Sequence, residues 1–121
     1  MPKKSLMDLQ REIVEEEREY FQRPMEYASR IAEIARDLLG DPNVRVFLFG
    51  SAAEGRAIPG ASDIDILVIS DRAPTKPGKL AELRVEILSR LGDLAAPVEI
   101  HILPPDRLDW LRRAGRVIPV R

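Results

Sequence analysis

The sequence predicts an α/β (α+β) fold, in which helices pack on a small three- or four-stranded mixed sheet. Two observations predict this class. Apolar segments of strand length recur along the chain, as "VRVFLF", "DIDILVIS" and "PVEIHIL". Segments with apolar residues at helical spacing stand before, between and after them. The expected order is therefore helix, helix, strand, strand, helix, strand, helix.

Two helices are expected before the first strand. Residues 5–21 have apolar residues near helical spacing with glutamates between them, and Pro24 ends or restarts this helix. A second helix follows and stops at Gly40, a residue suited to a helix C-terminus. We divide the chain before Pro24. Residues 1–23 form an N-terminal helix that serves an interface, and residues 24–121 form the main domain.

The remaining elements follow from the same patterns. The apolar stripes and turn residues predict strands, helices and a C-terminal edge segment in the following order. They are a strand at 44–49, a turn with a short helix at 50–55, a strand at 63–70, a helix at 80–91, a strand at 97–103, a helix at 104–115 and an edge segment at 116–121.

Length and composition restrict the class of protein. The chain has 121 residues, of which 32% are charged and 45% hydrophobic, as expected for one globular domain. Its formal net charge of -1 does not indicate nucleic acid binding. The absence of cysteine excludes disulfides and thiolate chemistry. The charged N-terminal segment predicts no membrane association and a cytoplasmic location.

Two carboxylates interrupt an apolar strand. Asp63 and Asp65 are one residue apart, so alternation places them on the same face. Close carboxylates repel each other, and a divalent cation with a preference for oxygen ligands, magnesium or manganese, relieves that repulsion. If the strand at 97–103 is a neighbour, Glu99 approaches the pair and His101 shares its face. Taken alone, Asp-x-Asp is more often a turn or capping signal, and a lone histidine more often makes an ordinary hydrogen bond.

A Gly-Ser pair directly follows the first strand. Gly50 permits a close backbone approach, and Ser51 supplies a hydroxyl and an amide where a short helix begins. A phosphate chain bound there and linked through a metal to Asp63 and Asp65 is chemically reasonable. By itself, the pair is better explained as a plain strand–turn–helix connection with a serine cap.

The ordered combination of these motifs resembles the DNA polymerase beta-type nucleotidyltransferase superfamily, and within it the minimal nucleotidyltransferases. The resemblance runs from about residue 44 to 103 and depends on a few small and acidic residues. They are Gly50, Ser51, Gly55, Ser62, Asp63, Ile64, Asp65 and Glu99.

The resemblance implies a magnesium-dependent transfer of a nucleoside monophosphate, AMP from ATP, to an acceptor hydroxyl. It implies that Asp63, Asp65 and Glu99 are catalytic and hold two Mg²⁺ ions, with Mn²⁺ as a substitute. It assigns Gly50 and Ser51 to the phosphates, with Ser62 orienting Asp63 or touching phosphate.

The resemblance also implies a partner. Minimal nucleotidyltransferases are often paired with HEPN-domain proteins, so the acceptor hydroxyl is expected on a tyrosine of a HEPN-type toxin, which gives the chain an antitoxin role. A homo-oligomer formed through the first helix is a second expected assembly.

The sequence departs from the family pattern at two places that bear on activity. The arginine that often follows Gly-Ser is replaced by Ala52, Ala53 and Glu54, so Arg56 is the expected phosphate-binding arginine. Glu99 stands where the third carboxylate is usually Asp. These departures leave an alternative function open, that of a catalytically inactive nucleotide- or protein-binding antitoxin subunit.

Overall fold

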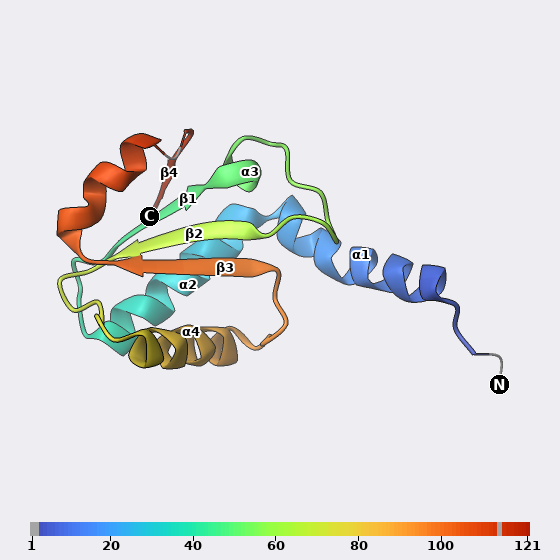
Figure 1. Cartoon of the computed structure of the whole chain (residues 1–121), viewed down its shortest axis with the longest axis horizontal. Helices are drawn as coiled ribbons and strands as arrows, with labels where there is room; N and C mark the ends of the chain where they lie inside the picture. The colour runs from blue at the N-terminus through green and yellow to red at the C-terminus, as the bar shows by residue number, and fades with distance from the viewer. Residues whose placement is uncertain (1–2, 114) are drawn as a thin grey trace.

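A computed structural model describes residues 3–113 and 115–121. Helices pack on one four-stranded mixed sheet, as the sequence predicts (Figure 1). In order along the chain, the elements are α1 (Leu6–Gln22), α2 (Pro24–Leu39), β1 (Arg45–Phe49), α3 (Gly50–Ala53), β2 (Ile64–Ile69), α4 (Pro77–Leu91), β3 (Val98–Leu103), the 3₁₀ helix η1 (Pro105–Arg113) and β4 (Ile118–Val120). Among the described residues, no helix has the length and apolar character needed to cross a membrane.

The sheet has the strand order β3-β2-β1-β4. β1 is antiparallel to β2 and to β4, whereas β2 and β3 are parallel. β1 therefore ends at the same edge of the sheet where β2 and β3 begin. The C-terminal segment forms the edge strand β4, as expected from the sequence.

The main core lies between the sheet and the helices α2 and α4. Alternate residues of the strands, among them Leu48, Ile66 and Ile100, point to this face and are buried. The apolar stripe of α2 packs against them through Ala28 and Ile31, both fully buried. The apolar stripe of α2, whose residues recur at helical spacing, is thus the side that packs on the sheet.

The opposite face of the sheet carries a smaller apolar cluster beneath η1. Its buried members come from β1 and β2, and partly buried residues of β3 and the C-terminal segment pack against them. The cluster comprises Phe47, Phe49, Leu67 and Ile69, with Leu103, Trp110, Leu111 and Val117 at its border. This face is where the strands also carry their polar residues.

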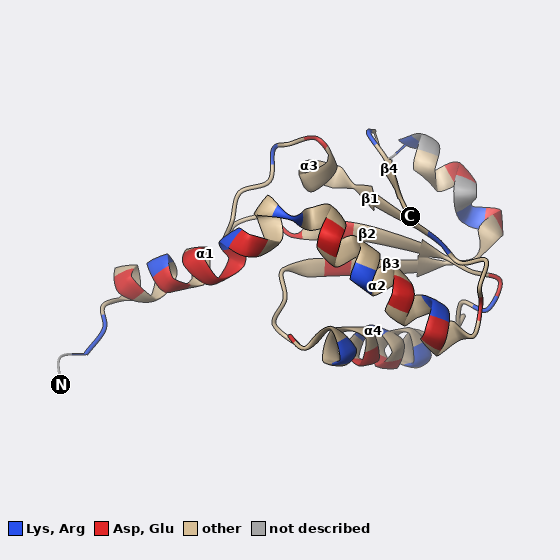
Figure 2. Cartoon of the chain, turned by 180° about the vertical axis from the view of Figure 1, so that it is seen from behind, with Lys and Arg blue, Asp and Glu red and all other residues tan. Residues whose placement is uncertain are grey.

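α1 projects from the body of the protein, and its N-terminal turns lie away from the sheet (Figure 1). None of its residues, all of which the structure describes, is buried. Ser5 caps the helix, with its hydroxyl accepting a hydrogen bond from the amide of Asp8. At the other end, the hydroxyl of Tyr20 donates a 2.6 Å hydrogen bond to Asp93 in the α4–β3 loop. Seen from behind, α1 has acidic residues along most of its length (Figure 2).

Most element boundaries differ from the prediction by one or two residues, and two helices differ further. α4 begins at Pro77 rather than at residue 80, because proline suits the first position of a helix, where its missing amide hydrogen costs nothing. The last helix is the 3₁₀ helix η1, a type that the prediction of a helix at 104–115 did not specify. Apolar spacing does not distinguish the two over so short a segment.

Candidate functional site

Three neighbouring strands bring a row of residues together at one edge of the sheet. Phe49 at the end of β1 pairs in register with Asp65 near the start of β2. Asp65 in turn pairs with Glu99 near the start of β3. Because residues directly across a ladder share a face, Phe49, Asp65 and Glu99 all project on the η1 side. The sequence expectation that β2 and β3 are neighbours is thereby confirmed.

The position of Asp65 explains how an apolar strand accommodates a carboxylate. Its neighbours Ile64 and Ile66 are fully buried in the main core, but Asp65 projects to the other face. The next residues on that face, Leu67 and Ile69, belong to the cluster beneath η1. Asp65 stands beyond the end of that cluster, and its side chain keeps 23% of its surface exposed.

Asp65, Glu99 and His101 form a group in which each offers one ligand atom within 4.8 Å of the others. His101 follows Glu99 by two residues on β3, so alternation places both on one face. Its Nε2 atom lies 3.6 Å from Oδ1 of Asp65 and 3.7 Å from Oε1 of Glu99. Two carboxylates and an imidazole are a donor set suited to a divalent metal ion.

The electrostatics of this group are unfavourable without a cation. Partial burial and the nearby charge of Glu99 raise the pKa of Asp65, whereas His101 acts in the opposite direction. A divalent cation between the carboxylates would remove the repulsion.

The Gly-Ser turn lies directly beside Asp65. Gly50 begins α3 with a φ of +70°, a conformation that glycine adopts without strain. A Cβ atom at this position would overlap the carboxylate of Asp65. Gly50 therefore lets the backbone of the turn approach the acidic group, as the sequence suggested, and it brings Ser51 to the same edge of the sheet.

Three other predicted site residues lie outside this group. Asp63 precedes β2 and is exposed, and it does not belong to the group of Asp65, Glu99 and His101. The hydroxyl of Ser62 accepts a 3.0 Å hydrogen bond from the amide of Ile58 and so closes the preceding loop. The guanidinium of Arg56 is paired with Glu54, and this pair lowers the pKa of Glu54.

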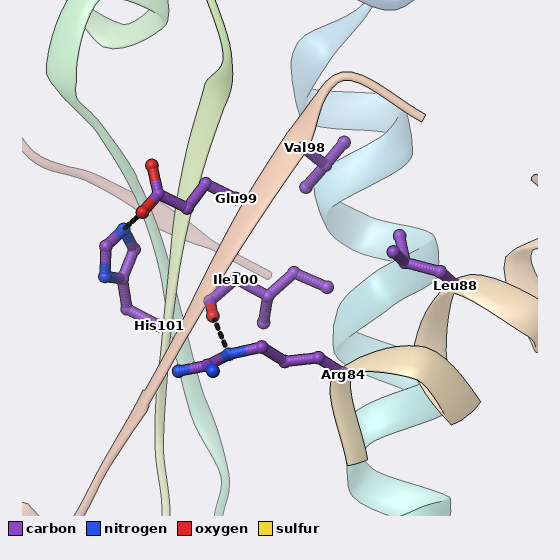
Figure 3. Close-up of a pocket in the computed structure, with 6 residues that line it drawn as sticks. All are labelled: Arg84, Leu88, Val98, Glu99, Ile100 and His101. Atoms are coloured by element: carbon purple, nitrogen blue, oxygen red, sulfur yellow. Dashed lines mark hydrogen bonds and ion pairs between the residues drawn. The ribbon is translucent and has the colours of Figure 1, made fainter. Parts of the chain in front are cut away.

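A cavity of about 260 Å³ opens beside the group on its β3 side. Its lining combines Glu99 and His101 with apolar residues of α4 and β3 (Figure 3). Arg84 of α4 also lines it, and its Nε donates a 2.8 Å hydrogen bond to the carbonyl oxygen of Ile100. The cavity thus has a positive charge on one wall and a carboxylate on another.

Sequence reasoning gave no role to His101 or Arg84. The spacing of two between Glu99 and His101 was the available signal for the histidine, because it places both on the same face of β3. No comparable signal exists for Arg84, whose position depends on how α4 packs beside the edge of β3.

Comparisons with known proteins found a matching domain family and two similar solved structures. The model of the nucleotidyltransferase domain family matches residues 28–118. A solved structure of an inferred nucleotidyltransferase from Sulfolobus solfataricus is similar, with 25% identity and a TM-score of 0.52 over 84% of this chain and 82% of that one. A second inferred nucleotidyltransferase is 24% identical, with a TM-score of 0.50 over 75% of this chain and 94% of that one, and supports the fold alone. No curated protein matches the sequence significantly.

Proposed function

Because the chain belongs to the nucleotidyltransferase domain family, we propose that it transfers AMP from ATP to an acceptor hydroxyl with the help of Mg²⁺. The observation that carries this proposal is the pairing of Asp65 with Glu99 across β2 and β3, directly beside the turn at Gly50. A general nucleotidyl transfer follows from the family, whereas the nucleotide, the cation and the acceptor are the parts that we propose.

The donor set fits a divalent cation. Asp65 and Glu99 supply carboxylate oxygens, the ligands that Mg²⁺ prefers. Partial burial and then the charge of Glu99 raise the pKa of Asp65, and a cation would stabilise the charged carboxylate against both. When bound, the cation would neutralise charge on the phosphates and make the acceptor hydroxyl more acidic. A two-ion mechanism of the polymerase beta type also requires Asp63, and we propose that this exposed side chain joins the other two carboxylates when ATP binds.

The two sides of the site suit two substrates. We propose that the triphosphate lies at Gly50 and Ser51, and that the acceptor enters through the cavity beside Glu99. The acceptor oxygen then attacks the α-phosphorus, a new phosphorus–oxygen bond forms, and the bond to the bridging oxygen breaks to release pyrophosphate. Glu99 assists by drawing the hydroxyl proton away from the acceptor.

The acceptor is proposed to be a tyrosine hydroxyl of a HEPN-type toxin, with this chain as the antitoxin. The resemblance to minimal nucleotidyltransferases supports this partner. We also propose that α1 takes part in the assembly, with the partner or with a second copy, because apolar residues in its first half are exposed, including Leu6 at 71% and Ile13 at 49%.

One observation favours a second function. Arg56, the arginine expected to bind phosphate, is already paired with Glu54, and the acidic side chain adds negative charge near the turn. A subunit that binds protein or nucleotide without catalysis would tolerate this arrangement.

A binding and transfer experiment distinguishes the nucleotidyltransferase from the inactive subunit. We expect ATP to bind the full chain in the presence of Mg²⁺ but not with EDTA, as measured by calorimetry. With ATP labelled at the α-phosphate and a co-purified partner, we expect label on the partner and release of pyrophosphate. The change Asp65→Asn should lower the transfer rate by about a hundredfold or more.

A change at an exposed aspartate far from the site, Asp71→Asn, is the matched control and should retain the wild-type rate. Binding of ATP that is insensitive to EDTA, with no labelled product from any co-purified partner, would support the inactive subunit instead.

A further inference from the structure

We propose that His101 is a third, nitrogen ligand of the metal site and that the site therefore binds Mn²⁺ in preference to Mg²⁺. The inference rests on the proposed function, because it concerns the cation that Asp65 and Glu99 would hold. It goes further by adding a ligand that is neither carboxylate nor phosphate, and by naming the metal that such a ligand favours.

The position of the imidazole supports this role. Nε2 of His101 stands 3.6 Å and 3.7 Å from the nearest carboxylate oxygens of Asp65 and Glu99. These separations exceed the usual range for a hydrogen bond, about 2.7–3.2 Å. Ligand atoms lie about 2.1 Å from a small divalent cation, so two ligands of one ion stand at most about 4.2 Å apart. The observed spacing falls between those limits and leaves room for a shared ion.

The same nitrogen lacks a hydrogen-bond partner. Nε2 of His101 is buried and makes no hydrogen bond within the described part of the chain, although the whole side chain keeps 30% of its surface exposed. A buried polar atom without a partner is costly, and such atoms call for an explanation. A metal ion coordinated by Nε2 would satisfy it.

Aromatic neighbours hold the ring in this orientation. The imidazole centroid lies 5.2 Å from that of Phe49 and 6.0 Å from that of Trp110. Phe49 and Trp110 in turn meet edge to face at 5.0 Å. The ring is thus packed on its apolar sides while Nε2 is directed at the carboxylates, and Figure 3 shows it turned toward Glu99.

The donor set determines the preferred metal. Mg²⁺ takes oxygen ligands almost exclusively, whereas imidazole nitrogen increases affinity for first-row transition metals. Among these, Mn²⁺ best suits a site that also contains carboxylates and has to accept phosphate oxygens. Replacement of the nitrogen should therefore weaken Mn²⁺ binding selectively.

The test uses the full chain freed of metal, without nucleotide or partner. Calorimetric titration should give an affinity for Mn²⁺ at least about tenfold higher than that for Mg²⁺. In His101→Asn we expect the Mn²⁺ affinity to fall about tenfold or more, while the Mg²⁺ affinity changes by less than about threefold. Electron spin-echo measurements on bound Mn²⁺ should detect coupling to a nitrogen nucleus in the wild type and lose it in the variant.

His101→Gln serves as a second variant in case the first does not fold, and circular dichroism verifies the fold of each. Unchanged Mn²⁺ affinity and no nitrogen coupling in the wild type would overturn the proposal, as would an equal loss of affinity for both metals. If the protein shows nitrogen coupling but transfers no nucleotide, the proposed function is wrong and this inference still holds. If Mg²⁺ supports transfer but bound Mn²⁺ shows no nitrogen coupling, the proposed function holds and this inference is wrong.

Discussion

The carboxyl group of Asp65 ionises less readily in the folded protein than in the unfolded chain, because partial burial and Glu99 raise its pKa above the ordinary 3.8. Between those two pKa values the folded protein binds more protons, so the free energy of unfolding falls as pH rises. We predict that metal-free Asp65→Asn is more stable than the metal-free wild type at pH 7. Its advantage should shrink as pH approaches 4. Urea unfolding in EDTA at both pH values measures this, and equal stabilities throughout would contradict it.

Gly50 and Gly55 provide a matched pair for the close approach of the turn to Asp65. Both have positive φ, 70° and 71°, so alanine at either costs about 1–2 kcal/mol of backbone strain. Only at Gly50 would the added Cβ overlap Asp65, since nothing lies within 4 Å of the corresponding atom at Gly55. We predict that Gly50→Ala is less stable than Gly55→Ala by about 1–3 kcal/mol.

The same pair should differ in metal binding. Gly50→Ala displaces the Asp65 carboxylate and should weaken Mn²⁺ and Mg²⁺ binding, whereas Gly55→Ala should leave both affinities unchanged. Thermal or urea unfolding measures the first effect and calorimetry the second. Identical behaviour of the two variants would show that the turn does not constrain Asp65.

At the scale of single residues, strand alternation was enough to predict that Glu99 and His101 share a face of β3. Asp63 has the same parity as Asp65 but precedes β2, is exposed and lies outside the group of Asp65, Glu99 and His101. Alternation did not predict that Arg56 pairs with Glu54, because that contact depends on the path of a loop. Alternation determines the face of a side chain only within a strand, where the ladder hydrogen bonds continue. Beyond the end of the strand it no longer determines the direction of a side chain.

At the scale of elements, α1 is attached mainly through its last turns. Tyr20 stacks near Tyr27, with ring centroids 4.2 Å apart, and its hydroxyl donates to Asp93. Burial and the hydrogen bond to Asp93 raise the pKa of Tyr20 strongly, so the hydroxyl keeps its proton at neutral pH. The helix itself was predictable from its spacing, and the division before Pro24 set it apart from the main domain. The contacts that attach it were not predictable, since they depend on which residues find partners.

We predict that Tyr20→Phe lowers the free energy of unfolding by about 1 kcal/mol, because a hydrogen bond between two elements is lost. A double-mutant cycle with Asp93→Ala isolates the pairwise contribution, since Asp93 also accepts a hydrogen bond from the amide of Ala95. Urea unfolding of the four proteins gives the coupling. A coupling energy near zero would mean that the Tyr20–Asp93 contact does not secure α1.

At the scale of the whole molecule, the sequence predicted helices packed on a small mixed sheet, but it did not predict the order of the strands in that sheet. The parallel pairing of β2 and β3 decides the site, because it sets Asp65 beside Glu99 rather than beside the far end of β3. An antiparallel pairing would have been equally compatible with the apolar pattern. The helix α4 between these strands is what permits the parallel arrangement, since such a connection crosses over the sheet.

Because the proposed ligands come from two strands, cation binding should stabilise the entire fold and not only the site. A ligand that binds only the folded state adds about 2.7 kcal/mol at a concentration one hundred times its Kd. For a domain of this size, that corresponds to a rise in Tm of about 10 °C.

We predict such a rise for the wild type with Mn²⁺, reversed by EDTA, and a rise of similar size with Asp71→Asn, whose exposed carboxylate lies outside the site. Asp65→Asn should show almost none, although its metal-free Tm starts higher at pH 7. Calorimetric scans of the three proteins with and without Mn²⁺ measure this, and an equal rise in Asp65→Asn would mean that the stabilising cation binds somewhere other than between β2 and β3.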